Sequence, residues 1–163
     1  MDHLWTPWRM AYIQENQNDE SCIFCLAAEA EDNEENLVFY RGKFMFMILN
    51  RYPYTSGHVM CVPYAHVDRL HGLTDEGRNE MMSLVNRAVD VLQRIYEPEG
   101  FNVGLNLGEV AGAGVADHLH MHIVPRWGGD TNFMSAVGQT RVLPESLPDT
   151  YRRVKEEWES IED

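Results

Sequence analysis

Three histidines alternate with apolar residues over a short stretch of the chain. His118, His120 and His122 are separated by Leu119 and Met121. Alternation with a period of two is typical of a half-buried β-strand, so all three imidazoles are expected on one face. A chance metal-chelating tract is the plain alternative. Crowding three like groups on one face brings no packing benefit, and we therefore favour a functional site.

A glycine-rich loop precedes the histidines and a proline follows them. Gly108, Gly112 and Gly114 let the backbone approach a ligand closely and tolerate a positive φ. Pro125 is expected to end the strand, because proline cannot donate a ladder hydrogen bond. A dinucleotide-binding fingerprint is rejected, since that motif needs a helix directly after the glycines and here a strand follows.

The cysteines suggest a second kind of chemistry. The chain has an odd number of cysteines, Cys22, Cys25 and Cys61, and no export signal is expected. Both features argue against a disulfide framework. The C-x-x-C pair is then a metal or a redox pair. A redox pair of the thioredoxin kind needs a βαβ context that this region does not supply. Half of a zinc knuckle is favoured, and it requires two more ligands from elsewhere.

Length and charge limit the class of protein. The chain has 163 residues, 44% of them hydrophobic, which suits one domain over residues 1–163. A net charge of −13 would repel a nucleic-acid backbone. The longest apolar run, Phe44–Leu49, is too short for a membrane span, and we expect a soluble, cytoplasmic protein. Of the 13 basic residues 11 are arginine, whose fork suits small anionic ligands.

Periodicity and turn signals predict the elements that position these residues. Thr74 is expected to cap a long amphipathic helix that ends near Tyr96. Asn50 at a strand end and His58 after a glycine are polar groups on rigid elements, although each alone is more often structural. A short helix or an acidic loop is expected over 26–35. The other predicted elements are strands over 37–40, 43–49, 58–62 and 101–107 and a helix over 149–161.

These motifs together resemble one family. The run from His118 to Val124 matches the H-φ-H-φ-H-φ-φ signature of the histidine triad (HIT) nucleotide hydrolases and transferases. The resemblance spans roughly residues 20–130 and keeps the family's order of elements. The further matching features are the Asn50-Arg-x-Pro loop, the stretch 57–63, the long helix, Asn106 before the glycine loop, and Pro125-Arg126-Trp127.

Within the family, the chain most resembles the bacterial diadenosine tetraphosphate phosphorylase branch. The resemblance rests on the aromatic segment over 1–20, the run 100–108 and the ending over 122–130. Residues 131–163 are expected to form a C-terminal extension with a helix. Two features limit the resemblance: the cysteine pair belongs to zinc-containing members and is not expected in every phosphorylase of that branch, and Gly114 stands where many hydrolases carry a hydroxyl or amide.

The resemblance implies an α+β fold, an antiparallel sheet of about five strands with one long helix and a C-terminal helix, paired as a homodimer. It also implies nucleotidyl transfer from a dinucleoside polyphosphate through a nucleotidyl-histidine, with phosphate preferred over water as acceptor. His120 would be the nucleophile and His122 would contact the scissile phosphate. The implied nucleotide-binding residues are Asn50, His58, Asn106, Gly112, Gly114 and Arg126, and the implied ligands of a structural zinc are Cys22, Cys25, His66 and His118.

Elementary chemistry agrees with a histidine nucleophile. Neutral imidazole attacks phosphorus well near physiological pH, and a covalent intermediate splits one difficult displacement into two easier steps. The reacting ring must present a bare nitrogen, so its other nitrogen has to donate a hydrogen bond. The alternatives are a hydrolase of dinucleoside polyphosphates or phosphoramidates, a catalytic metal held by three imidazoles, and a zinc-stabilised nucleotide-binding module without turnover.

Overall fold

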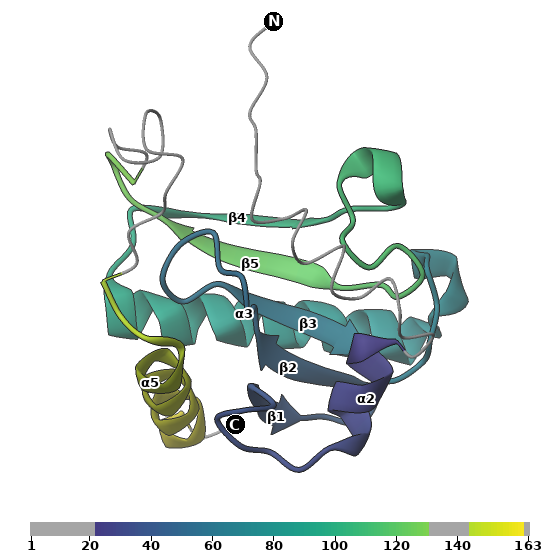
Figure 1. Ribbon diagram of the computed structural model, residues 1–163, viewed down its shortest axis with the longest axis horizontal. Helices are drawn as coiled ribbons and strands as arrows, with labels where there is room; N and C mark the ends of the chain where they lie inside the picture. Colours follow the sequence, from purple (N-terminus) through teal and green to yellow (C-terminus); the bar gives the residue numbers. More distant parts are fainter. Residues whose placement is uncertain (1–21, 131–143, 162–163) are drawn as a thin grey trace, which may run out of the picture.

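The chain folds as an α+β domain around one antiparallel sheet (Figure 1). The computed structural model describes residues 22–130 and 144–161. Within them the sheet has the order β1-β2-β3-β5-β4, and every neighbouring pair is antiparallel. The strands are β1 Val38–Arg41, β2 Met45–Leu49, β3 Val59–Pro63, β4 Gly100–Leu105 and β5 Met121–Arg126.

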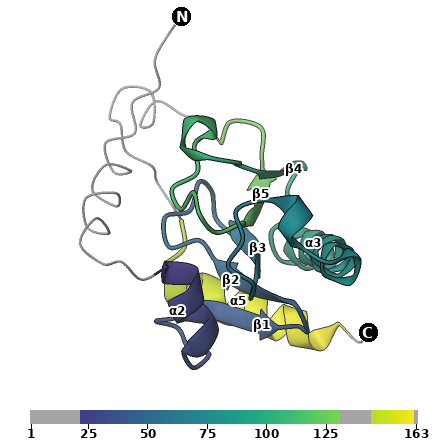
Figure 2. The same cartoon turned by 90° about the vertical axis from the view of Figure 1, so that its right-hand side faces the viewer.

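Helices cover both faces of the sheet (Figure 2). The long helix α3 packs on β2, β3 and β5 and contacts α5, which also packs on β1. The short helix α2 lies on the opposite face. Because both faces are covered, β2 and β3 are buried along their whole length. The helices are α2 Ile23–Glu29, α3 Asp75–Tyr96 and α5 Leu147–Ser160, with 3₁₀ turns η1 Leu70–Gly72 and η2 Glu109–Ala111.

Local sequence signals account for the bounds of α3. The Thr74 hydroxyl accepts a hydrogen bond from the Gly77 amide at 3.1 Å, which satisfies one of the unpaired donors of the first turn. At the other end Glu97 adopts the left-handed conformation that commonly ends a helix. The predicted capping residue and the predicted end at Tyr96 are both confirmed.

The stretch that carries the histidines differs from its prediction in two ways. β5 begins at Met121, so His118 and His120 precede the strand. Both histidines are buried, as the alternating Leu119 and Met121 are, because Phe24 of α2 covers the histidine side. Pro125 lies inside β5 and pairs with Phe101 of β4. Proline is tolerated there because the pairing of β3 with β5 extends only to Ile123, so no ladder bond on that side is lost.

The other predicted elements are present, with bounds shifted by a few residues. The segment over 26–35 is a helix followed by an acidic turn: α2 begins at Ile23, and residues 31–35 are exposed. No helix among the described residues is long and apolar enough to cross a membrane. The aromatic segment over 1–20 and most of the C-terminal extension before α5 lie outside the described residues.

Candidate active site and metal centre

A cavity of about 560 Å³ lies between α2 and the sheet. Its floor is a row of three paired residues on neighbouring strands, Ile48, Met60 and His122. α2 supplies one wall with apolar side chains, and Gly112 and Gly114 of the glycine loop lie at its edge. The other lining residues include Asn50, Arg51, Tyr52, Tyr54, Val115 and His120. A largely apolar cavity with a few converging polar groups suits a small ligand.

His120 is buried at this cavity, and one of its ring nitrogens is held by a hydrogen bond. Its Nδ1 lies 2.8 Å from the backbone oxygen of His118. A carbonyl can only accept a hydrogen bond, so Nδ1 carries the proton and Nε2 of the neutral ring keeps its lone pair. Burial lowers the pKa of His120 below its ordinary value, more than the bond to His118 raises it. The ring is therefore neutral at physiological pH, with a nucleophilic Nε2.

A chain of hydrogen bonds fixes the opposite tautomer in His122. The Tyr54 amide donates to Nδ1 of His58 at 3.1 Å, so neutral His58 carries its proton on Nε2. That nitrogen lies 2.9 Å from Nδ1 of His122 and donates to it. His122 then carries its own proton on Nε2. At the cavity, His120 thus offers an unprotonated Nε2 that can accept a hydrogen bond, and His122 offers an Nε2–H that can donate one.

Asn50, which directly follows β2 as predicted, also contacts this chain of hydrogen bonds. Its side-chain oxygen accepts a hydrogen bond from the Tyr52 amide at 2.9 Å, so its amide nitrogen faces His58, 3.3 Å from Nδ1. Asn50 lines the cavity, whereas buried His58 acts from behind His122 and does not line it. Asn50 can therefore reach a ligand directly, and His58 acts through His122.

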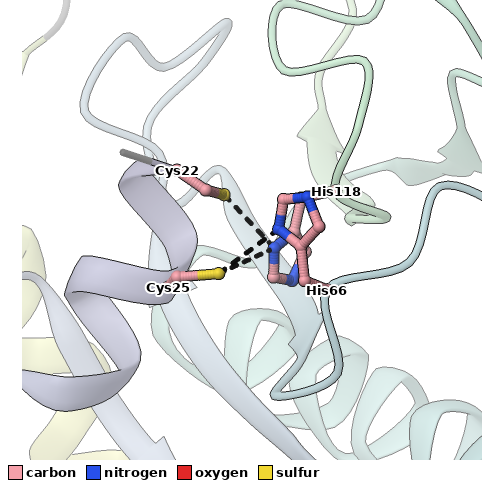
Figure 3. A group of neighbouring side chains, drawn as sticks. All are labelled: Cys22, Cys25, His66 and His118. Atoms are coloured by element: carbon pink, nitrogen blue, oxygen red, sulfur yellow. Dashed lines mark hydrogen bonds between the residues drawn. The ribbon is translucent and has the colours of Figure 1, made fainter. Parts of the chain in front are cut away.

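His118 turns away from the cavity toward the two cysteines (Figure 3). Its Nε2 donates to the Pro63 carbonyl at 2.8 Å, so Nδ1 keeps its lone pair. That Nδ1 lies 3.3 Å from Sγ of Cys22 and 3.6 Å from Sγ of Cys25. His66 completes the cluster, with its Nδ1 3.3 Å from Sγ of Cys25. We call Cys22, Cys25, His66 and His118 the Cys–His tetrad.

The tetrad fits a tetrahedral metal ion. Its four ligand atoms all lie within 4.8 Å of one another. Zinc bonds to sulfur and imidazole nitrogen of about 2.0–2.3 Å would place ligand atoms roughly 3.3–3.8 Å apart. The three sulfur–nitrogen separations given above, 3.3 to 3.6 Å, lie in this range. Two sulfurs and two nitrogens are a donor set that zinc prefers, and four protein ligands leave no open position. A closed site of this kind is structural.

The same geometry argues against a catalytic metal held by the three triad imidazoles. His118 belongs to the tetrad, and Nδ1 of His120 is bound to a carbonyl. Among residues 22–130 and 144–161, the tetrad is the one group of three or more histidine, cysteine or acidic side chains placed to hold a metal. The three histidines therefore belong to two sites: His118 is part of the tetrad, and His120 and His122 line the cavity.

The two other polar residues expected at the site differ in their positions. Asn106 is half-buried and follows Leu105, the strand partner of Met121, so its backbone lies beside His120, although it is not among the residues that line the cavity. Arg126 is at the far end of β5, six residues and roughly 20 Å from His120 at the usual strand rise. Its guanidinium pairs with Asp130 at 2.9 Å and donates to Asn102 at 2.6 Å. The structure does not bring Arg126 to the cavity of its own chain.

Helix α2 contributes a wall that the sequence reasoning missed. Ile23, Ala27 and Ala30 recur at helical spacing and line the cavity together with Phe24. That spacing is a usable signal, but a seven-residue helix is too short for it to be distinctive. Arg51 is a cationic residue that lines the cavity, and in the sequence it stands out only as part of the Asn50-Arg-x-Pro loop.

Comparisons with known proteins give a family match over most of the chain. Residues 31–129 match the HIT domain family. The chain is 43% identical to the AP-4-A phosphorylase of Mycobacterium tuberculosis, over 97% of this chain and 85% of that protein.

Two solved structures share the fold. A HIT family protein from Bacillus subtilis is 32% identical, with a TM-score of 0.59, over 68% of this chain and 76% of that one. A Zn-bound histidine triad family protein from Mycobacterium smegmatis is 24% identical, with a TM-score of 0.68, over 86% of this chain and 94% of that one.

Proposed function

The chain belongs to the HIT family, and on this premise we propose that it is a nucleotidyl transferase that acts on dinucleoside polyphosphates. The favoured reaction converts diadenosine tetraphosphate and phosphate into ADP and ATP. The carrying observation is that the Nδ1 hydrogen bond of His120 to the His118 carbonyl leaves an unprotonated Nε2 at the cavity. The name of the M. tuberculosis relative supports the same substrate.

The reaction has two displacements at one phosphorus. Nε2 of His120 attacks the phosphorus next to one adenosine, forming a P–N bond while the P–O bond to the departing ATP breaks. A phosphate oxygen then attacks the same phosphorus, the P–N bond breaks, and ADP leaves. The positive charge on the substituted imidazole is stabilised through its Nδ1 hydrogen bond to the His118 carbonyl.

The neighbouring groups would hold the phosphate oxygens. The Nε2–H of His122, fixed by His58, can donate to a non-bridging oxygen as negative charge develops. Backbone amides from Gly112 to Gly114 lie at the same cavity, and Gly112 has a φ of 97°, a conformation that a side chain would strain. Asn50 is proposed to bind the ribose. Asn106, beside His120 in the sheet, is proposed to hold a phosphate oxygen, whereas Arg126 would need a second chain to take part.

Phosphate rather than water is proposed as the acceptor. Gly114 leaves room beside the reacting phosphorus where a side chain would otherwise stand, and it lines the cavity. Backbone amides of the glycine loop suit a second anion there. The chemistry of the first displacement is the same for both acceptors, so a hydrolase is the runner-up.

The tetrad is proposed to hold a structural zinc ion. The metal would join α2, the loop after β3 and the triad segment, which come from three separate parts of the chain. The Leu119 amide donates to the Val67 carbonyl at 2.6 Å, so the loop that carries His66 is also bonded directly to the triad segment. Zinc would strengthen a junction that the fold already makes.

The chain is also proposed to form a homodimer through the edge of its sheet. β4 is an edge strand, and no described strand pairs with its outer side. Val103 on β4 is 44% exposed, and nearby Leu107 is exposed as well. An edge strand with exposed apolar side chains is suited to pairing with a second copy.

We predict that His120→Ala abolishes turnover while AMP binding and the fold persist. Removal of a nucleophile that works within a group of residues lowers the rate by orders of magnitude, about 10⁴-fold or more, but leaves ground-state contacts in place. Rates with diadenosine tetraphosphate and calorimetric AMP titrations measure the two effects. His71→Ala, an exposed histidine in η1, is the matched control. Near wild-type turnover by the His120 variant would exclude this nucleophile.

We predict that products depend on phosphate. With phosphate present, diadenosine tetraphosphate should yield ADP and ATP at a rate that rises with phosphate concentration and saturates, because a bound acceptor is aligned for attack. Chromatography of quenched reactions measures this. If AMP stays the main adenylyl product at millimolar phosphate, the protein is a hydrolase.

We predict about one zinc per chain in protein purified without added metal, as a closed four-ligand site requires. Cys25→Ser should lose most of the metal and lower the melting temperature, since binding stabilises the folded state. Elemental analysis and thermal melts measure both. Cys61→Ala is the control, because Cys61 is buried in β3 away from the tetrad. Equal zinc contents in the two variants would refute the assignment.

We predict that the protein sediments at about twice the chain mass and that Val103→Lys shifts it toward monomer, because charge on an edge strand opposes pairing. Analytical ultracentrifugation measures the mass. Leu70→Lys, at an exposed position in η1, is the control. A monomeric wild type would end this proposal.

A further inference from the structure

The ring of Phe24 contacts the proposed nucleophile. Phe24 is 4% exposed, and its ring centroid lies 5.0 Å from that of His120 and 5.4 Å from that of His118. The His122 ring lies 4.9 Å from His120. The Nδ1 hydrogen bond of His120 fixes one point on its ring, and these two neighbouring rings restrict rotation about it.

The helix that carries Phe24 cannot fix its own position. α2 has seven residues, shorter than a helix that is stable alone in water. Its C-terminal carbonyls accept hydrogen bonds from the guanidinium of Arg41 at 2.5 to 3.1 Å. At its other end Cys22 is the N-cap residue and Cys25 follows one turn later, and both thiols belong to the Cys–His tetrad. Phe24 thus lies between two tetrad residues.

We propose that Phe24 is a positioning residue for His120: its ring, placed by the Cys–His tetrad on either side of it, keeps the bare Nε2 of His120 directed at the cavity. This rests on the proposed role of His120 as the nucleophile. Zinc in the tetrad would act on catalysis only through this contact and the His118 backbone. The tetrad and the cavity are then joined by the Phe24 ring and by the His118 backbone.

The main test compares Phe24→Leu with Phe39→Leu. Phe39 is equally buried at 4% exposed but packs on Trp158, away from the triad. Formation of acid-labile adenylyl enzyme in a single turnover should slow about tenfold or more in the Phe24 variant, since small losses of alignment are costly. The Phe39 variant should stay within about twofold despite a similar loss of stability. Phe24→Tyr, which keeps the ring, should restore most of the rate.

Two further readouts separate positioning from a passive wall. If Phe24 only touched the ligand, AMP affinity would fall while the rate at saturation stayed the same. ¹⁵N spectra of the imidazoles report the tautomer of His120 without turnover, and the single Nδ1–H form should give way to a mixture in Phe24→Leu. A rate matching that of Phe39→Leu, together with an unchanged tautomer, would overturn the proposal.

A double-mutant cycle tests the link to the tetrad. Cys25→Ser and Phe24→Leu should combine less than multiplicatively, because they disturb one unit, whereas Cys25→Ser and Phe39→Leu should multiply. Multiplicative effects in both cycles would remove the tetrad from the proposal. If the wild type forms no adenylyl enzyme while the tautomer still depends on Phe24, the proposed function fails and the positioning role stands.

Discussion

The site depends on the three separate bonds that His118 makes. Its Nε2 donates a hydrogen bond to the Pro63 carbonyl, and its Nδ1 faces the cysteine thiols. Its backbone oxygen accepts a hydrogen bond from the protonated Nδ1 of His120. Each bond fixes something different: the ring tautomer, the geometry of the metal ligands and the tautomer of the nucleophile. A buried residue with this many directional constraints has one orientation, so the active site and the metal centre share one fixed reference point.

The division of labour among the histidines follows from their surroundings. His120 and His122 are close in the chain and carry opposite tautomers, because one meets a carbonyl and the other meets the Nε2–H of His58. Burial favours the neutral form of His120, as the direction of its pKa shift indicates. An unprotonated ring nitrogen and a hydrogen-bond donor are thereby placed side by side at the cavity.

Helix α2 links the two centres mechanically. The same short segment supplies two thiols to the Cys–His tetrad, an aromatic contact to His120 and an apolar wall to the cavity. Because it is too short to be stable alone, its position depends on anchors at both ends. Arg41 holds one end and the tetrad residues Cys22 and Cys25 lie at the other, so a metal bound by the tetrad would be coupled to the shape of the cavity.

The histidine spacing and the C-x-x-C pair can be read directly from the chain, and the long helix follows from local periodicity and capping. Thr74 and Tyr96 could be identified from neighbouring residues alone. The family motifs also pointed to His66 as the fourth member of a cluster that the structure assembles.

Which nitrogen each imidazole presents, and which residues reach the cavity, depend on contacts between distant parts of the chain. The partner that fixes His118 is Pro63, 55 positions away, and the partner of His122 is His58, 64 positions away. No local pattern encodes such pairs, because they arise from the strand order and register. The same reason explains Arg126: spacing placed it near the triad in the chain, but an extended strand carries it to the other end of the sheet.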